Sequence, residues 1–114
     1  MAYDEALAER FRAALARRKN ITEKRMMGGV CFLVNGNMIG GADRNKSGAG
    51  RFMFRVGKDN AEAAEALPGA EQMVQGGRKM SGFFFVPEAV CNADVMGVWL
   101  DLAFSFASSL PPKT

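Results

Sequence analysis

The sequence predicts a two-layer α+β domain with helices on one face of an antiparallel five-stranded sheet, in the order α-β-β-β-α-β-β-α. Three observations lead to this prediction. Segments with helical spacing of apolar residues stand at both ends of the chain. Several short apolar runs between them are joined by Gly-containing turns, which link antiparallel neighbours. With 114 residues, 48% hydrophobic and 24% charged, the chain has the size and composition of one globular domain, 1–114.

Three helices are expected. The first spans residues 4–18, begins at Asp4 as N-cap and has an apolar face of Leu7, Phe11, Ala14 and Leu15. The second is Ala-rich, spans residues 58–67 and ends at Pro68-Gly69. The third runs from Asn92, a favourable N-cap, to about residue 109. Its expected buried stripe consists of Val95, Val98, Trp99, Leu102, Phe106 and Leu110.

The strands between the first two helices come next. Residues 22–27 form a short extended stretch, broken by Gly28-Gly29, that would make a further strand if counted. The apolar run 30–34 is followed at once by Asn35-Gly36, which favours a type I′ hairpin turn because both central residues need positive φ. Residues 38–41 form the returning strand.

Residues 51–56 alternate as a half-buried strand does. Phe52, Phe54 and Val56 are expected in the core, while Arg51, Met53 and Arg55 lie on the other, semi-exposed face. Residues 71–74 and 82–86 predict two more strands, joined through residues 76–79. The run Phe83-Phe84-Phe85-Val86 predicts a strand covered on both faces.

The composition removes the common catalytic and metal-binding machinery. There is no histidine, which is the usual general base and the commonest nitrogen ligand. Cys31 and Cys91 lie far apart and cannot by themselves form a four-ligand zinc site, and Cys31 is expected to be a small buried hydrophobe. No phosphate-binding glycine motif precedes a helix. We therefore expect a non-enzyme without catalytic residues, metal or cofactor.

The N-terminus is acidic from its fourth residue, unlike a signal peptide. No apolar run approaches the ~20 residues needed to cross a bilayer. A cytoplasmic protein with reduced cysteines and no membrane partner is therefore expected.

Basic residues and methionines indicate a binding role. Eight methionines suggest gap-filling in the core or an adaptable contact surface, of which the core is favoured. Arginine with methionine and aromatic residues is typical of protein interfaces, whereas arginine with aromatics can also stack on single-stranded bases. The net charge of only +3 favours a protein partner, a homodimer included, over nucleic acid, which is the alternative. A small-molecule binder or an enzyme of an unrecognised kind is a third, less favoured hypothesis. The predicted interaction surface comprises Lys24, Arg25, Met26, Arg51, Met53, Arg55, Arg78 and Lys79.

Residues 22–29, TEKRMMGG, begin a series of segments that resembles the TfoX (Sxy) N-terminal domain family of bacterial competence regulators. The series continues in family order with residues 32–38, 54–56 and 77–82 and the closing Trp-containing helix. Met27 replaces the usual aromatic residue, and the loop 43–50 is longer than usual. The resemblance implies a secretion-chaperone-like two-layer fold and a link to regulation of competence, with this chain as a stand-alone domain. It implies no catalytic residues.

Overall fold

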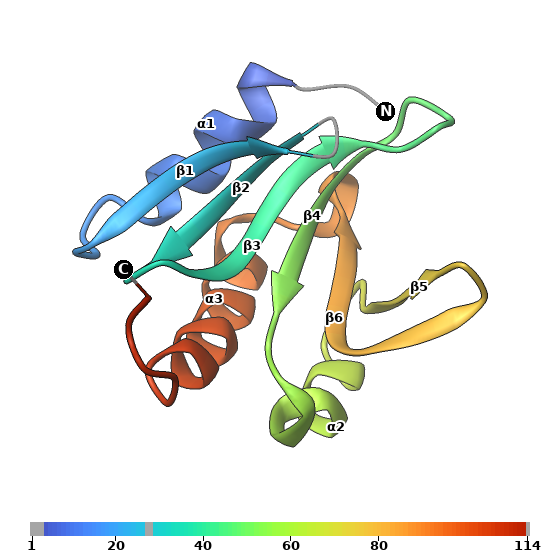
Figure 1. The fold of residues 1–114 in the computed structure, drawn as a ribbon. Coiled ribbons are helices and arrows are strands. Elements are labelled where there is room, and N and C mark those ends of the chain that lie inside the picture. Colours follow the sequence, from blue (N-terminus) through green and yellow to red (C-terminus); the bar gives the residue numbers. More distant parts are fainter. Residues whose placement is uncertain (1–3, 27–28, 114) are drawn as a thin grey trace.

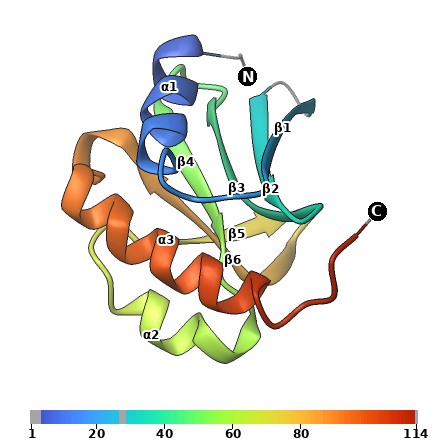
Figure 2. The ribbon, with the colours of Figure 1, turned by 90° about the vertical axis from the view of Figure 1, so that its left-hand side faces the viewer.

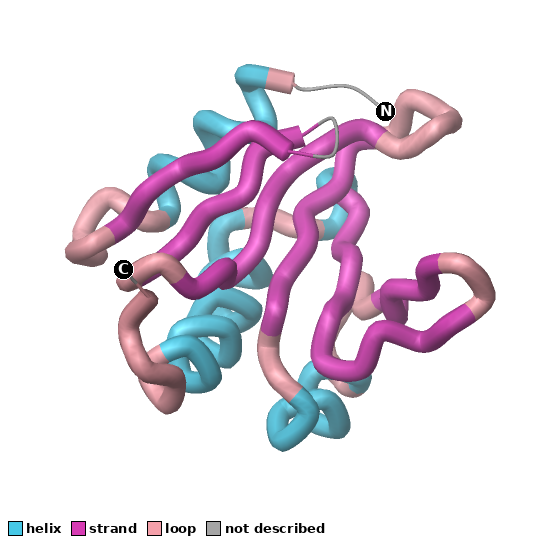
Figure 3. The backbone as a smooth tube through the Cα atoms, viewed as in Figure 1, coloured by secondary structure: helices cyan, strands magenta, loops and turns pink. Residues whose placement is uncertain are grey.

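Six antiparallel strands form one sheet in the computed structural model, which describes residues 4–26 and 29–113 (Figure 1). The order across the sheet is β1-β2-β3-β4-β6-β5, and Figure 3 shows the strands side by side. The strands are β1 (Ile21–Met26), β2 (Gly29–Val34), β3 (Asn37–Arg44), β4 (Gly50–Arg55), β5 (Glu71–Gln75) and β6 (Arg78–Pro87).

The prediction of five strands was therefore wrong, because the stretch 22–27 does form a strand, β1. Met27 and Gly28 lie outside the described residues. All of β1 after Ile21 is exposed, since β1 is an edge strand held by its backbone pairing with β2. An edge strand with little burial has no apolar alternation, and its sequence signal is correspondingly weak.

The helices are α1 (Glu5–Ala14), α2 (Ala61–Glu65) and α3 (Ala93–Ala107), and two 3₁₀ turns, η1 (Lys58–Asn60) and η2 (Glu88–Val90), precede α2 and α3. The element order is thus α-β-β-β-β-α-β-β-α. Figure 2 shows α1 and α3 on the same side of the sheet. The opposite side, toward the viewer in Figure 1, carries neither of these helices, and we call it the open face.

The predicted starts of the first and third helices and the predicted hairpin are confirmed, whereas the second helix begins at Ala61 and not at residue 58. Asp4 accepts a hydrogen bond from the Leu7 N–H at 3.1 Å, and Asn92 accepts one from the Val95 N–H at 2.9 Å. Asn35 and Gly36 have φ values of 51° and 82°, as a type I′ turn requires. Each of these features depends on a few consecutive residues, so it can be predicted from the sequence alone.

The predicted ends and faces of the helices were less accurate. The first helix ends at Ala14, which is exposed, and not at residue 18, because the Leu15 N–H turns back to the Arg12 carbonyl. Of the stripe predicted for α3, only Trp99 is fully buried, and Val98 is 46% exposed. The other predicted members are half-buried: Val95, Leu102, Phe106 and Leu110. Nearly every position of α3 is apolar, so helical spacing alone allows more than one stripe. The buried residues of α3 are Met96, Trp99, Leu100, Ala103 and Ala107.

Aromatic rings join the helices to the sheet. Phe11 of α1 stacks on Phe32 of β2 with ring centroids 4.6 Å apart. Trp99 of α3 stacks on Phe54 of β4 at 5.4 Å and meets Phe84 of β6 at 5.6 Å. The core therefore lies wholly between the helices and one face of the sheet, which leaves the open face to other uses.

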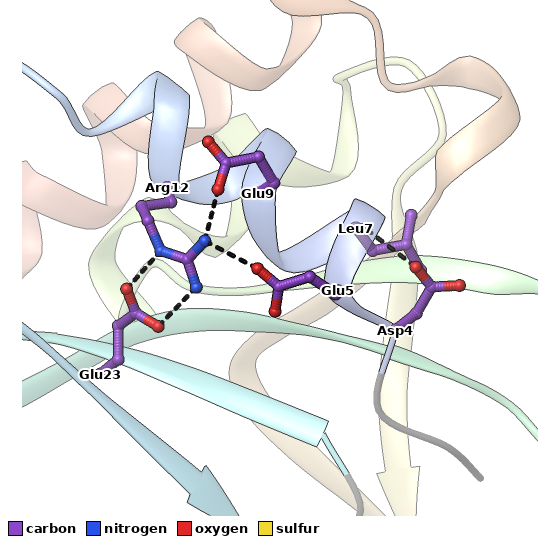
Figure 4. Close-up of polar contacts among 6 residues, drawn as sticks. All are labelled: Asp4, Glu5, Leu7, Glu9, Arg12 and Glu23. Atoms are coloured by element: carbon purple, nitrogen blue, oxygen red, sulfur yellow. Dashed lines mark hydrogen bonds and ion pairs between the residues drawn. The ribbon is translucent and has the colours of Figure 1, made fainter.

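An ion-pair cluster ties α1 to the edge strand (Figure 4). Arg12 reaches Glu5 and Glu9 of its own helix and forms a two-pronged contact with Glu23 of β1, in which Nη2 donates to Oε1 at 2.8 Å. The Arg12 hydrogen bond lowers the pKa of Glu23 from its usual value of 4.5. The carboxylate form is therefore favoured in the folded state.

Replacing Glu23 by Gln should destabilise the domain at neutral pH and have less effect in acid. Because folding lowers the pKa of Glu23, its contribution is complete above pH 4.5 and is lost as the pH falls through the lower folded value. Urea unfolding of both proteins at neutral pH and at roughly pH 3 measures the difference. Glu62→Gln, at an exposed position of α2, is the control. Equal differences at both pH values would contradict the prediction.

Candidate functional site

The open face of the sheet holds an apolar groove with a volume of about 340 Å³. Its lining comes from both edges and the centre of the sheet. Of the six methionines that the structure describes, Met96 lies in the core and five line the groove. These five, which define what we call the methionine groove, are Met26, Met38, Met53, Met73 and Met80.

The preference for core methionines was therefore wrong for most of them. Strand alternation explains where they lie: in β4, Phe52 and Phe54 point to the helices, as predicted, and Met53 points to the open face. Residues directly opposite in an antiparallel pair share a face. Met53 is opposite Gly41 of β3 on one side and Phe85 of β6 on the other. These three residues therefore lie in a row across the middle of the open face.

The floor of the groove is formed by small residues. Cys31 is opposite Gly41 in the β2–β3 pair, and both line the groove. A Cβ atom at Gly41 would lie 2.5 Å from the Val30 carbonyl oxygen, so a larger residue would require the backbone to move. Cys31 is 8% exposed, and burial raises its pKa, with a smaller contribution from Asp43. Its prediction as a small buried hydrophobe is confirmed.

The wall beside β6 is made by half-buried aromatic residues. Phe83 and Phe85 line the groove, whereas Phe84 and Val86 are buried on the helix side. The expectation that this strand is covered on both faces was therefore wrong. Its continuous apolar run supplies the core on one side and the groove on the other.

Arg51 is held in place at one end of the groove. Its Nε donates to Asp43 Oδ1 at 2.8 Å, and its guanidinium lies 3.7 Å from the centre of the Phe85 ring. Asp43 and Arg51 are opposite each other in the β3–β4 pair. The two charges offset one another, so this end of the groove is nearly neutral.

The other end carries uncompensated positive charge. The Arg55 guanidinium lies over Phe83 at 5.7 Å and over Phe106 at 5.1 Å. A neighbouring hollow is lined by Lys58, Arg78 and Lys79 and shares Gln75, Met80 and Phe83 with the groove. Within residues 4–26 and 29–113, these four cations form no ion pair. We call Arg55, Lys58, Arg78 and Lys79 the cationic end.

The eight residues of the predicted interaction surface are only partly brought together. Met26, Arg51 and Met53 line the groove. Arg55, Arg78 and Lys79 belong to the cationic end. The remaining two lie on edge strand β1, across the sheet from the cationic end: Lys24 is opposite Cys31 and shares its open face, whereas Arg25 is opposite the core residue Val30.

Sequence reasoning missed Met38, Met73, Met80 and Lys58 as members of this site. The available signal was the high methionine content together with alternation along each strand. Alternation places a residue on one of two faces but does not say which residues of distant strands become neighbours.

Metal binding and membrane spanning were the other properties to consider for the described residues. No group of three or more Cys, Asp or Glu side chains among them is arranged to hold a metal ion. None of the helices in the described part of the chain has the length and apolar character to cross a membrane.

Comparison with known proteins gives one match. A model of the TfoX N-terminal domain family matches residues 13–107, a span that includes all six strands and α3. No curated protein and no solved structure matches the chain. The whole methionine groove lies within the matched span.

Proposed function

The chain belongs to the TfoX N-terminal domain family, and from this membership we propose that it is a regulatory binding module that recognises another protein through the methionine groove. The observation that carries the proposal is the apolar groove on the face of the sheet that α1 and α3 leave uncovered. Exposed apolar surface of this kind marks interaction sites. Flexible, polarisable methionines let such a surface adapt to its partner.

Two features favour protein recognition over the alternatives. Lys24 and the pair Arg78-Lys79 lie at distant parts of the sheet, so they do not form the continuous basic surface that several simultaneous phosphate contacts need. The described lining of the groove contains two charged residues, Asp43 and Arg51. They pair with each other and so have a structural role. We accordingly propose a binding role without catalysis.

Met53→Glu should abolish partner binding, because it places a carboxylate in the centre of the groove, where a docked partner would remove it from water. Val98→Glu is the matched control, since Val98 is an exposed apolar residue on α3 in the opposite layer. Affinity capture followed by quantitative mass spectrometry compares the two variants with the wild type. We expect Met53→Glu to lower recovery of specific partners by at least about tenfold, the loss of one interface hot spot.

The control should recover the same partners as the wild type. Circular dichroism and thermal unfolding establish that both variants are folded. If Met53→Glu and Val98→Glu recover the same proteins in the same amounts, the groove is not the binding site. Sedimentation of the three proteins tells whether self-association accounts for any difference.

A further inference from the structure

Four arginines outside the groove differ from the residues of the cationic end in their surroundings. On the helix side, arginines are matched by acids: Arg18 pairs with Asp101 at 3.3 Å, and Arg44 pairs with Asp4 at 2.7 Å. Arg10 and Arg12 likewise have carboxylate partners. The four residues of the cationic end form no such pair in the described part of the chain. The cationic end is therefore available to carboxylates supplied by another molecule.

The cationic end is continuous with the groove. The groove and the hollow of Lys58, Arg78 and Lys79 share Met80 and Phe83 in their walls. A third hollow, lined by Arg55 and Lys58, also includes Phe83. A single extended ligand can therefore cover apolar and cationic surface together.

We propose that the occupant of the groove is an acidic amphipathic segment of another protein, whose large apolar side chains enter the methionine groove and whose carboxylates meet the cationic end. This inference rests on the proposed function and specifies its partner. A volume of about 340 Å³ lies near the lower limit of ordinary ligand pockets, about 300–1,000 Å³, which suits a few side chains.

The arginine of the cationic end is already ordered for this role. The Arg55 guanidinium lies over the rings of Phe83 and Phe106. It therefore loses little conformational entropy when it binds a carboxylate. Among the described residues that line the two hollows of the cationic end, Asp59 is the one acid. Four cations against this acid leave the region positive, which attracts a negatively charged segment.

A second copy of this chain is a poorer fit for the same surface. In a twofold-symmetric dimer the same patch occurs on both subunits. The cationic end would then face itself, the β1 side of the other groove, where Lys24 lies on the open face, or the Asp43–Arg51 end, where the carboxylate is already paired. Like charges placed opposite each other across an interface disfavour association. An acidic partner supplies the carboxylates that a second copy lacks at these positions.

The test is a selection of random displayed peptides of about 16 residues, roughly 24 Å long if helical, on the immobilised domain. The wild type should enrich peptides that combine several large apolar residues with a net negative charge. Met53→Glu should lose this enrichment. Combined reversal of the three residues of the cationic end other than Arg55, by Lys58→Glu, Arg78→Glu and Lys79→Glu, should keep apolar enrichment and lose the preference for acids.

The matched control carries the same change in net charge away from the groove: Arg17→Glu, Lys19→Glu and Lys46→Glu, all at exposed positions. It should select the same acidic peptides as the wild type. For one selected peptide, fluorescence anisotropy should give at least about tenfold weaker binding to the reversed cationic end, a loss of the size expected for charge-assisted contacts. The control should change the affinity far less.

Each other result has a defined meaning. If the selected peptides depend on Met53 but show no excess of acids, the groove binds protein and the acidic partner is wrong. If the domain selects no peptide and sediments as a dimer that Met53→Glu dissociates, a second copy fills the groove and the inference is overturned. If selection is independent of Met53, or a monomeric domain selects nothing, the proposed function itself fails.

Discussion

Replacing Trp99 by alanine should lower the free energy of unfolding by about 3–5 kcal/mol, the cost typical of removing a large buried aromatic side chain. Trp99 is completely buried and packs against Phe54 and Phe84, so it joins α3 to two neighbouring strands. Its Nε1–H also donates to the Pro68 carbonyl at 3.4 Å. Truncation would leave a cavity and remove this hydrogen bond at the same time.

Urea unfolding measures the change directly. Val98→Ala is the control. The Val98 side chain, next to Trp99 in the chain, is half exposed, so its truncation should change the free energy of unfolding by about 0.5 kcal/mol or less. Trp99→Phe, which keeps a ring in the core, should fall between alanine and the wild type. A loss below about 1 kcal/mol for Trp99→Ala, within the range of an ordinary substitution, would show that the core does not depend on this residue.

Replacing Gly82 by alanine should cost about 2–4 kcal/mol, from an unfavourable backbone angle and a backbone collision together. Gly82 has a φ of 81°. A Cβ atom there would lie 2.7 Å from the carbonyl carbon of Gly57 and 2.9 Å from its Cα. The Gly82 carbonyl also accepts hydrogen bonds from the N–H groups of Val56 and Gly57, so a displacement would loosen the end of β4.

Gly77→Ala separates the two contributions. Gly77 has a similar φ of 77°, but a Cβ atom there would meet nothing within 4 Å. Its replacement should cost about 1–2 kcal/mol, the price of the left-handed backbone alone. The difference between the two variants in urea unfolding measures the collision with Gly57. Equal losses would contradict the close packing of β6 against residue 57.

Much of the fold could be predicted because its signals are local. The caps at Asp4 and Asn92, the Asn35-Gly36 turn and the alternation of β4 each depend on residues within a few positions of one another. The core face of β4 and the burial of Cys31 followed from the same short-range patterns. The resemblance to the family, quoted from short motifs, agrees with the match over residues 13–107.

The predictions failed where burial depends on neighbours that are distant in the chain. β1 has no apolar alternation because its side chains after Ile21 are exposed at the sheet edge. The sequence of α3 allows several apolar stripes, and the position of the sheet buries the one that contains Met96, Leu100 and Ala103 beside Trp99. In both cases the local pattern is compatible with more than one arrangement, and packing decides between them.

The sequence by itself determined that this is an α+β domain without histidine, in which Met53 and the core residues of its strand alternate. Only the tertiary structure decided that five methionines from five strands share one groove, and that cations without an ion pair among the described residues gather at one end of it. The physical reason is register. Alternation assigns each side chain to a face, whereas the pairing of strands from distant parts of the chain decides which side chains meet on that face.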